Sequence, residues 1–334
     1  MKSKICGIII LLFILSFFFF SLQSNKIIVD MAKNTVKLPE KIERVITLDP
    51  FSTQIMIGLG LKDLLVDAQY GTNLVGEGFV QVAPEIQNWG SSFSGNTVIL
   101  ENLVEKKPDL IISQIGRPDI NKIMELKIPL VQIDVENDQA FIGSLNFIAD
   151  IFNKRAKAAE ISKFISIKLN EFYTANDKNK NKAKPKVYVA GSNILRTFGS
   201  SSFQKWLVSI AGGIFATESY NQLKIDINPE TLIKLNPDYI ILSKYTAEEI
   251  SQIISDARFS KINAIKNNKV FRIPSYILSW DLPSFEMIAG IGYLRYLFGF
   301  STATDFSDTI KNLYKIVYNL DLSDEQINSI FLAK

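Results

Sequence analysis

The chain has 334 residues, of which 47% are hydrophobic and 21% charged, and its formal net charge is +3. This apolar content excludes an intrinsically disordered chain, and the length is that of two domains rather than one. The small net charge indicates no nucleic acid or other polyanion as a partner. Histidine is absent, which removes the commonest general base and the commonest transition-metal ligand.

The first 24 residues have the pattern of an export signal. Lys2 and Lys4 precede an apolar stretch over residues 8–20, and small or polar residues follow it up to Ser24. We expect residues 1–24 to be a signal peptide. The alternative is an uncleaved N-terminal membrane anchor, because the apolar run is at the lower length limit for a bilayer span. Both alternatives place the folded part outside the cytoplasm.

The only cysteine, Cys6, lies before the apolar stretch instead of after it. A lipid-anchored protein carries its cysteine at the cleavage site, so we expect no lipid anchor here. The mature part then forms no disulfide and no thiolate metal site. Its stability must come from a large hydrophobic core.

Residues 25–143 predict a first α/β lobe in which strands and helices alternate. An edge hairpin is expected over 26–36 and a helix over 52–59, and buried strands are expected over 44–48, 64–68, 110–113 and 130–133. This alternation predicts a mostly parallel sheet, with the ligand over the carboxyl ends of its strands.

Residues 144–180 predict a long interlobe helix, over 144–175, and a charged linker. Apolar residues recur there at helical spacing, and the helix would be about 45 Å long. A second α/β lobe is predicted over 181–300, with a helix over 202–211, an apolar helix that opens at 280–286 and ends at Leu297, and strands over 186–191, 239–242 and 270–273. Residues 301–334 predict a tail of two amphipathic helices, over 305–318 and 323–332, packed on the outside.

One sequence unit occurs in both lobes. Glu101 opens a run that reaches Pro108-Asp109 and an apolar strand, and Glu230 opens the same run up to Pro237-Asp238. In each copy a short helix stops before a proline that cannot continue it, and a buried strand follows. We therefore predict an α/β fold with two Rossmann-like lobes, joined by a long α-helix, and a ligand cleft between the lobes.

Several short motifs, taken in their order and spacing, are similar to those of one family. They are Arg44-Val45-Ile46-Thr47, the two Pro-Asp units, the long helix over 144–175, Lys186-Val187-Tyr188-Val189, Ala211-Gly212-Gly213, Lys269-Val270-Phe271 and Trp280-Asp281-Leu282-Pro283-Ser284. Over residues 40–300 the chain resembles the solute-binding proteins of ABC importers that carry iron siderophores, haem, cobalamin and, in some members, molybdate or tungstate.

The resemblance implies a periplasmic, monomeric binding protein without cofactor or catalysis. It would capture a metal chelate between its lobes and deliver it to a permease dimer with its ATPase; molybdate or tungstate is the alternative ligand. In that family a glutamate at the start of the repeated helix of each lobe docks onto the permease, which implies this role for Glu101 and Glu230. The alternative for both is a carboxylate favoured at the positive end of a helix.

We expect the ligand to touch loops at the strand ends, over residues 49–52, 69–72, 89–93, 114–117, 193–203, 244–245 and 276–281. The candidates for flat walls around a large chelate are Tyr70, Trp89, Phe93, Tyr245, Tyr276 and Trp280. For Trp280 a place in the core is the alternative. Arg117 and Arg196 are candidates to grip a carboxylate, catecholate or oxyanion, unless they are solvated surface residues. Ser91, Ser200 and Ser201 offer hydroxyls, and a helix cap is the alternative for the stretch before 203.

An α/β metal-cluster enzyme or chelatase is the rival class of function, since such enzymes also use two lobes around a cleft. The sequence contains no nucleophile elbow, phosphate loop or dinucleotide fingerprint, and it has no imidazole base, so this class is disfavoured. Direct capture of a bare transition metal is disfavoured too, because only carboxylates, tyrosines and carbonyls remain as ligands.

Overall fold

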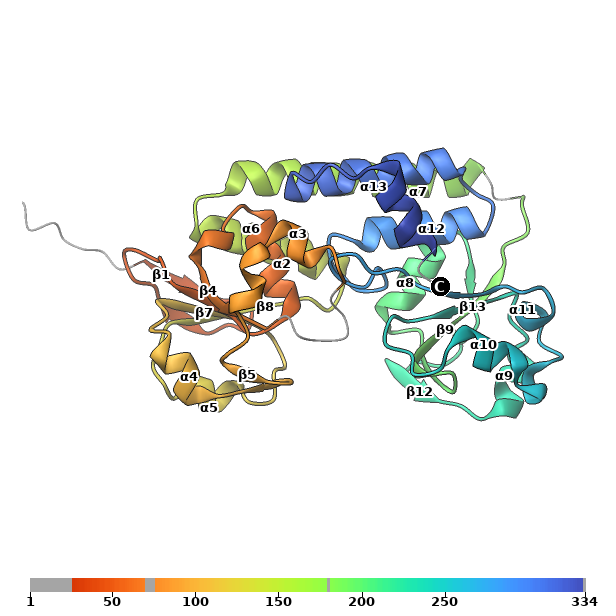
Figure 1. Ribbon diagram of the computed structural model, residues 1–334, viewed down its shortest axis with the longest axis horizontal. Coiled ribbons are helices and arrows are strands. Elements are labelled where there is room, and N and C mark those ends of the chain that lie inside the picture. The colour runs from red at the N-terminus through yellow and green to blue at the C-terminus, as the bar shows by residue number, and fades with distance from the viewer. Residues whose placement is uncertain (1–25, 70–75, 179–180, 333–334) are drawn as a thin grey trace, which may run out of the picture.

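The computed structural model describes residues 26–69, 76–178 and 181–332. They form two α/β lobes side by side, with helices that run along the top of both lobes in Figure 1. The predicted signal segment and Tyr70 lie outside the described residues. Among the residues described, no helix combines the length and the apolarity that a bilayer crossing requires. The predicted fold class is confirmed.

The N-terminal lobe contains a sheet whose strands are all parallel. Their order is β4 (Leu65–Ala68), β3 (Val45–Thr47), β7 (Leu110–Gln114) and β8 (Leu130–Ile133). Strands β3 and β8 are buried along their whole length, which explains why they lack the polar alternation of an exposed strand. The predicted hairpin is also present, as β1 (Ile27–Val29) and β2 (Thr35–Lys37).

Short helices surround this sheet. They are α2 (Pro50–Gly58), α3 (Phe79–Val82), α4 (Leu100–Glu105), α5 (Ile120–Met124) and α6 (Asp138–Ile151), and a small hairpin consists of β5 (Phe93–Ser94) and β6 (Thr97–Val98). Helix α2 begins directly after β3 because Asp49 caps it and Pro50 takes the first helical position.

The C-terminal lobe has a mixed sheet. Its order is β12 (Lys224–Asp226), β10 (Arg196–Phe198), β9 (Lys186–Asn193), β13 (Tyr239–Leu242) and β14 (Val270–Arg272), with β11 (Ile214–Phe215) beside β9. Strands β10 and β12 are antiparallel additions that the sequence analysis did not predict. The helices are α8 (Phe203–Ile210), α9 (Pro229–Leu235), α10 (Ile250–Ser255) and α11 (Asn263–Lys266).

The repeated sequence unit turns in the same way in both lobes. After α4 the chain passes through Lys107 at φ 47°, and after α9 it passes through Asn236 at φ 43°. Both left-handed residues end a helix before the proline of the unit. Leu103 of α4 and Leu232 of α9 are fully buried, as predicted.

The aspartates of the two units make equivalent hydrogen bonds. Asp109 Oδ2 accepts the N–H of Arg44 at 2.9 Å, and Asp238 Oδ2 accepts the N–H of Lys186 at 2.9 Å. Arg44 directly precedes β3, and Lys186 opens β9. Each carboxylate therefore fixes the start of the strand that pairs in parallel with the strand of its own unit.

The prediction of a single helix over 144–175 is wrong. Helix α6 ends at Ile151, and α7 (Arg155–Lys178) begins after a break. Asn153 adopts φ 57°, and the N–H of Lys154 donates to the carbonyl of Ala149 at 2.8 Å, which closes the end of α6. Helix α7 packs on α6 of one lobe and α8 of the other, so α7 is the part of the predicted helix that joins the lobes.

The C-terminal helices are α12 (Met287–Leu297), α13 (Ala303–Tyr318) and α14 (Asp324–Leu332). The structure contains both amphipathic helices predicted for the tail, and α13 packs on both lobes. Its Phe306 and Tyr314 are 1% and 0% exposed, and the helix packs on α12 as well as on α2 of the N-terminal lobe. One face of the amphipathic pattern therefore belongs to the core at the junction of the lobes.

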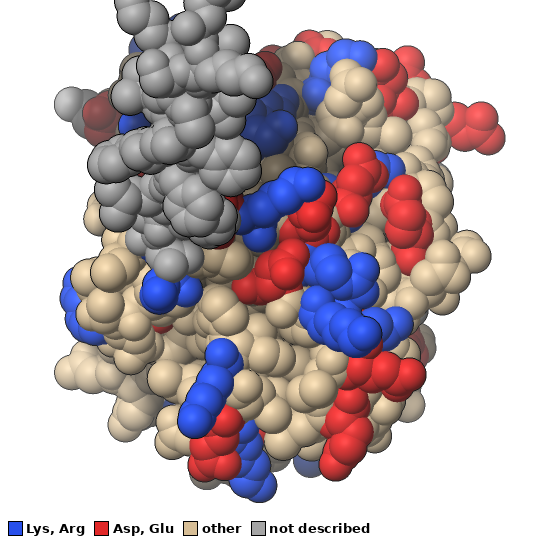
Figure 2. Space-filling view, turned by 90° about the vertical axis from the view of Figure 1, so that its left-hand side faces the viewer, with Lys and Arg blue, Asp and Glu red and all other residues tan. Residues whose placement is uncertain are grey.

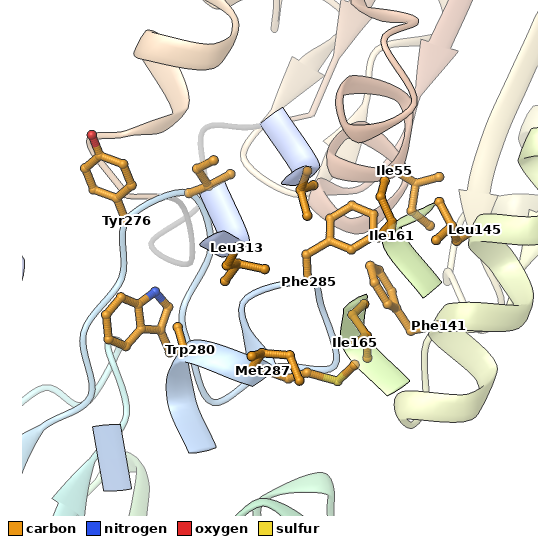
Figure 3. Packing of buried hydrophobic residues seen from close by; sticks show 14 of the residues in the cluster. Ile55, Phe141, Leu145, Ile161, Ile165, Tyr276, Trp280, Phe285, Met287 and Leu313 are labelled. Atoms are coloured by element: carbon orange, nitrogen blue, oxygen red, sulfur yellow. The ribbon is translucent and has the colours of Figure 1, made fainter. Parts of the chain in front are cut away.

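Phe285, just before α12, inserts into this junction. Its ring is fully buried and lies edge-on to that of Phe141 of α6, with 4.9 Å between the ring centroids. Figure 3 shows Phe285 among Ile55 of α2 and Ile161 of α7. A residue from the second half of the chain thus completes the core of the first lobe, and one hydrophobic core continues through both lobes.

Beside Phe285, the carboxyl group of Glu286 is fully buried. It accepts hydrogen bonds from the N–H groups of Ile277 and Leu278, from the Tyr314 hydroxyl and, at 3.4 Å, from the side-chain amide of Gln54. Burial raises the pKa of Glu286 to about 7, although these donors act in the opposite direction. Through these hydrogen bonds the Glu286 carboxyl group connects α2, α13 and the segment before α12.

Candidate functional site

A pocket of about 400 Å³ opens at the carboxyl ends of β3, β4 and β7. A parallel sheet is expected to present its ligand at this edge. The lining combines residues of the predicted loops, Asp49, Pro50, Phe51, Gln69, Gln114 and Arg117, with four that the sequence analysis did not single out, Asn96, Thr97, Pro118 and Asp119. We call it the N-lobe pocket.

Asp49 lies at the base of the N-lobe pocket and is 2% exposed. Its Oδ1 accepts the N–H of Ser52 at 2.8 Å, and its Oδ2 accepts the Ser52 hydroxyl and the N–H of Gln114, each at 2.7 Å. Burial raises the pKa of Asp49, while these hydrogen bonds act to lower it. The carboxyl group holds the start of α2 against the end of β7.

Arg117 is 8% exposed, and its guanidinium faces the protein. Nη1 donates to the carbonyl of Leu48 at 2.5 Å and to Gln69 Oε1 at 3.3 Å, and Nη2 donates to the carbonyl of Asn96 at 2.7 Å. Nε and Nη2 contact the carboxylate of Asp119 at 2.6 and 3.2 Å. Arg117 therefore braces the wall of the pocket that it lines, and its role in binding an anion stays a prediction.

The loop after α3 is fixed by Asp67 of β4. This buried carboxylate accepts the hydroxyl of Ser91 at 3.1 Å and the N–H and hydroxyl of Ser92 at 2.9 and 2.7 Å. Trp89 is 7% exposed and packs into the core, and Phe93 is half-buried in β5. The structure thus places Trp89 and Ser91 in the support of the loop and outside the lining of the N-lobe pocket.

A second, smaller pocket of about 40 Å³ lies at the ends of β9 and β10. Arg196, Lys224 and Tyr245 are among the residues that line it. Arg196 is 44% exposed and pairs with Asp226 at 2.8 Å, so its guanidinium is accessible to solvent. Burial raises the pKa of the Tyr245 hydroxyl, which therefore stays protonated as a donor. We call it the C-lobe pocket.

The aromatic residues of the stretch 276–281 lie in the core instead of a cleft wall. Trp280 is fully buried, and its Nε1 donates to the Tyr314 hydroxyl at 3.3 Å. Tyr276 is 6% exposed and packs edge-on against Tyr314. Figure 3 shows both residues beside Leu313 of α13. The alternative considered for Trp280, a core residue, agrees with this position.

Ser200 and Ser201 contact a neighbouring loop. The Ser200 hydroxyl lies 3.2 Å from Asn221 Oδ1, and the Ser201 hydroxyl donates to the carbonyl of Asn221 at 2.9 Å. Ser202, which was not singled out, caps α8 by accepting the N–H of Lys205. The helix-cap alternative therefore applies to this stretch, through Ser202.

Glu101 and Glu230 occupy matching places. Both are exposed residues in the first turn of their helices, α4 and α9. The two helices lie at the lower edge of the two lobes in Figure 1, on the side away from α7. The cap of α9 is Asn228, whose Oδ1 accepts the N–H of Thr231 at 2.9 Å, so Glu230 is not needed as a cap.

Charged side chains do not form a field of one sign on the outer end of the N-terminal lobe. Figure 2 shows acidic and basic residues interspersed there. Nor do the described residues contain a group of three or more His, Cys, Asp or Glu side chains placed to hold a metal ion.

The fold and the pockets define a class: a two-lobed α/β protein with polar pockets at strand ends and a helix across both lobes. Residues 45–277 match the periplasmic binding protein family, and the chain belongs to that family.

Its relatives include a molybdate-binding protein and a solute-binding protein of known structure. The molybdate-binding protein MolA of Haemophilus influenzae is 25% identical over 301 residues, which are 83% of this chain and 85% of that protein. The structure of MolA bound to molybdate aligns with a TM-score of 0.79 at 22% identity, over 90% of this chain and 99% of that one. A periplasmic solute-binding protein from Veillonella parvula aligns with a TM-score of 0.78 at 23% identity, over 91% and 96%.

Proposed function

We propose that the chain is the periplasmic substrate-binding component of an ABC importer and that it captures a metal chelate for delivery to the permease. The observation that supports this ligand class is the N-lobe pocket. Its volume of about 400 Å³ falls in the range of sites for organic ligands and exceeds the need of a single tetrahedral oxyanion. Phe51 and two prolines in its lining provide apolar contact area.

The composition of the chain supports a chelated metal over a bare one. With no histidine and no cysteine after Cys6, the folded part offers mainly oxygen ligands, which select poorly for transition metals. A metal wrapped in an organic chelator needs no such ligands from the protein. Contact of the chelate with both lobes remains part of the proposal, with Arg196 and Tyr245 as the candidates on the second lobe.

Delivery is proposed to use the two matching glutamates. Glu101 and Glu230 are exposed at the same side of the molecule, one on each lobe. Two carboxylates held at a fixed separation suit a permease dimer that offers two basic pockets. The shared core around Phe285 would limit the relative motion of the lobes to a small closure and so keep this separation nearly constant.

A molybdate-type oxyanion is the second candidate. The relation to MolA favours it, and the C-lobe pocket contains the cations Arg196 and Lys224, which suit an anion. This candidate uses the C-lobe pocket alone, whereas the chelate would also occupy the N-lobe pocket, so the two can be separated by the ligand that binds.

Titration of tryptophan fluorescence distinguishes the candidates, because the chain has 3 tryptophans. We expect saturable changes with a ferric hydroxamate chelate and none with the metal-free chelator at the same concentrations. Saturation by molybdate alone would replace the first candidate by the second. No response to any of the three, confirmed by calorimetry, would contradict the proposed ligand classes.

A further inference from the structure

Among the described residues that line it, the N-lobe pocket has one cationic side chain, Arg117, which is buried and paired with Asp119. Its Nη1 and Nη2 groups donate to the carbonyls of Leu48 and Asn96, to Gln69 Oε1 and to Asp119 Oδ2. Its Nε lies 2.6 Å from Asp119 Oδ1 as a charge contact and makes no hydrogen bond of its own. Four of the five donors of the guanidinium are therefore committed, and the fifth is buried beside the Asp119 carboxylate.

Carboxyl groups outnumber cations in this pocket. Asp49 and Asp119 face the single charge of Arg117, and no other charged residue contributes to the lining. Asp119 neutralises the charge of Arg117, with 2.6 Å between Asp119 Oδ1 and Arg117 Nε. An anionic ligand group entering here would therefore be desolvated next to a carboxylate and gain no free cation in return.

The uncommitted groups of the pocket are neutral. The side-chain amide of Gln114 and the hydroxyl of Thr97 make no hydrogen bond within the described part of the chain, and both line the pocket. Phe51 adds an apolar face beside them. Such a wall pairs with amide or hydroxamate groups and with the methylene chains that connect them.

We propose that the N-lobe pocket selects a chelate by charge, accepting an uncharged or cationic hydroxamate-type chelate and rejecting anionic catecholates and oxyanions. Asp119 is the specificity-determining residue, because it holds Arg117 neutralised. This inference rests on the proposed function and specifies its ligand class. It concerns one lobe, so it is independent of whether Arg196 contributes from the other.

The test compares the Kd values of a neutral ferric trihydroxamate and of a ferric tris-catecholate of charge −3. The unmodified protein should bind the neutral chelate more tightly. Asp119→Asn should tighten binding of the tris-catecholate by about tenfold or more, because it uncovers the Arg117 charge in a buried site. Asp119→Glu, which keeps the charge, should retain the original preference.

Asp150→Asn is the matched control, since it releases an exposed arginine, Arg155, away from both pockets. It should leave the ratio of the two Kd values unchanged. Tighter binding of the tris-catecholate by the unmodified protein, or an unchanged ratio in a folded Asp119→Asn variant, would overturn the inference and leave the proposed function standing. Binding of neither chelate would overturn both.

Discussion

In the N-terminal lobe Asp109 holds the start of β3, and in the C-terminal lobe Asp238 holds the start of β9 by the same type of hydrogen bond. The pockets above these frameworks differ, with volumes of about 400 and about 40 Å³. In the second lobe the antiparallel strand β10 lies beside β9, β12 lies beside β10, and these two strands supply Arg196 and Lys224 to the lining. The repeated unit therefore sets the sheets, and the segments between the repeats set the pockets.

The largest effect is expected where the two lobes have to act together. Glu101→Ala combined with Glu230→Ala should abolish ligand uptake in cells that lack the unmodified protein, while the Kd for ligand stays unchanged. The reason is that both exposed carboxylates are remote from the residues that line the pockets. Glu105→Ala, an exposed acid of the same helix α4, is the control and should preserve uptake. A parallel loss of affinity in the double variant would contradict the docking role.

The second largest expected effect tests whether the two lobes unfold independently of each other. Phe285→Ala should lower the free energy of unfolding by about 3 to 5 kcal/mol, because it empties a site in the core that both lobes share. Tyr173→Ala, at an aromatic residue that is 49% exposed, should cost no more than about 0.5 kcal/mol. Chemical denaturation measures both. Two separate unfolding transitions in the unmodified protein would show that the lobes fold as independent units.

The smallest expected effect is the loss of stability when either aspartate of the repeated unit, Asp109 or Asp238, is replaced. Asp109→Ala and Asp238→Ala should each destabilise the protein by about 0.5 to 1.5 kcal/mol, because each removes a hydrogen bond to an exposed strand-start N–H. The loss should be greater for Asp109, which accepts N–H groups of both Glu43 and Arg44, at 2.8 and 2.9 Å. Asp109→Asn keeps an acceptor oxygen and should lose less. A negligible effect of both alanine variants would mean that the repeat does not set the register of the strands.

Much of the fold could be predicted because it depends on local signals. The proline of each repeated unit, the apolar runs of β3 and β8 and the cap at Asp49 are all visible in the sequence. The break between α6 and α7 was missed, since Asn153 is neither glycine nor proline and only its positive φ ends the helix. Antiparallel β10 was missed because its three residues have no pattern of their own.

The location of the candidate site was predicted better than the identity of the residues that line it. Loops at the carboxyl ends of strands were expected to meet, and Asp49, Gln69 and Gln114 do line one pocket. Trp89 and Tyr276 were misplaced, because they fill core positions that sequence alone does not distinguish from a cleft wall. For Trp280 the core alternative agrees with the structure, and Tyr245 does line the C-lobe pocket. Asp119, which neutralises Arg117, was overlooked since a mostly buried ion pair has no sequence signature.

The account rests on capture of a metal chelate, and the bound ligand itself tests it most directly. Native mass spectrometry of the protein purified from its own cells, with elemental analysis of the same sample, should detect a transition metal together with the mass of an organic chelator. Molybdenum or tungsten without organic mass would contradict the proposed ligand and favour the oxyanion.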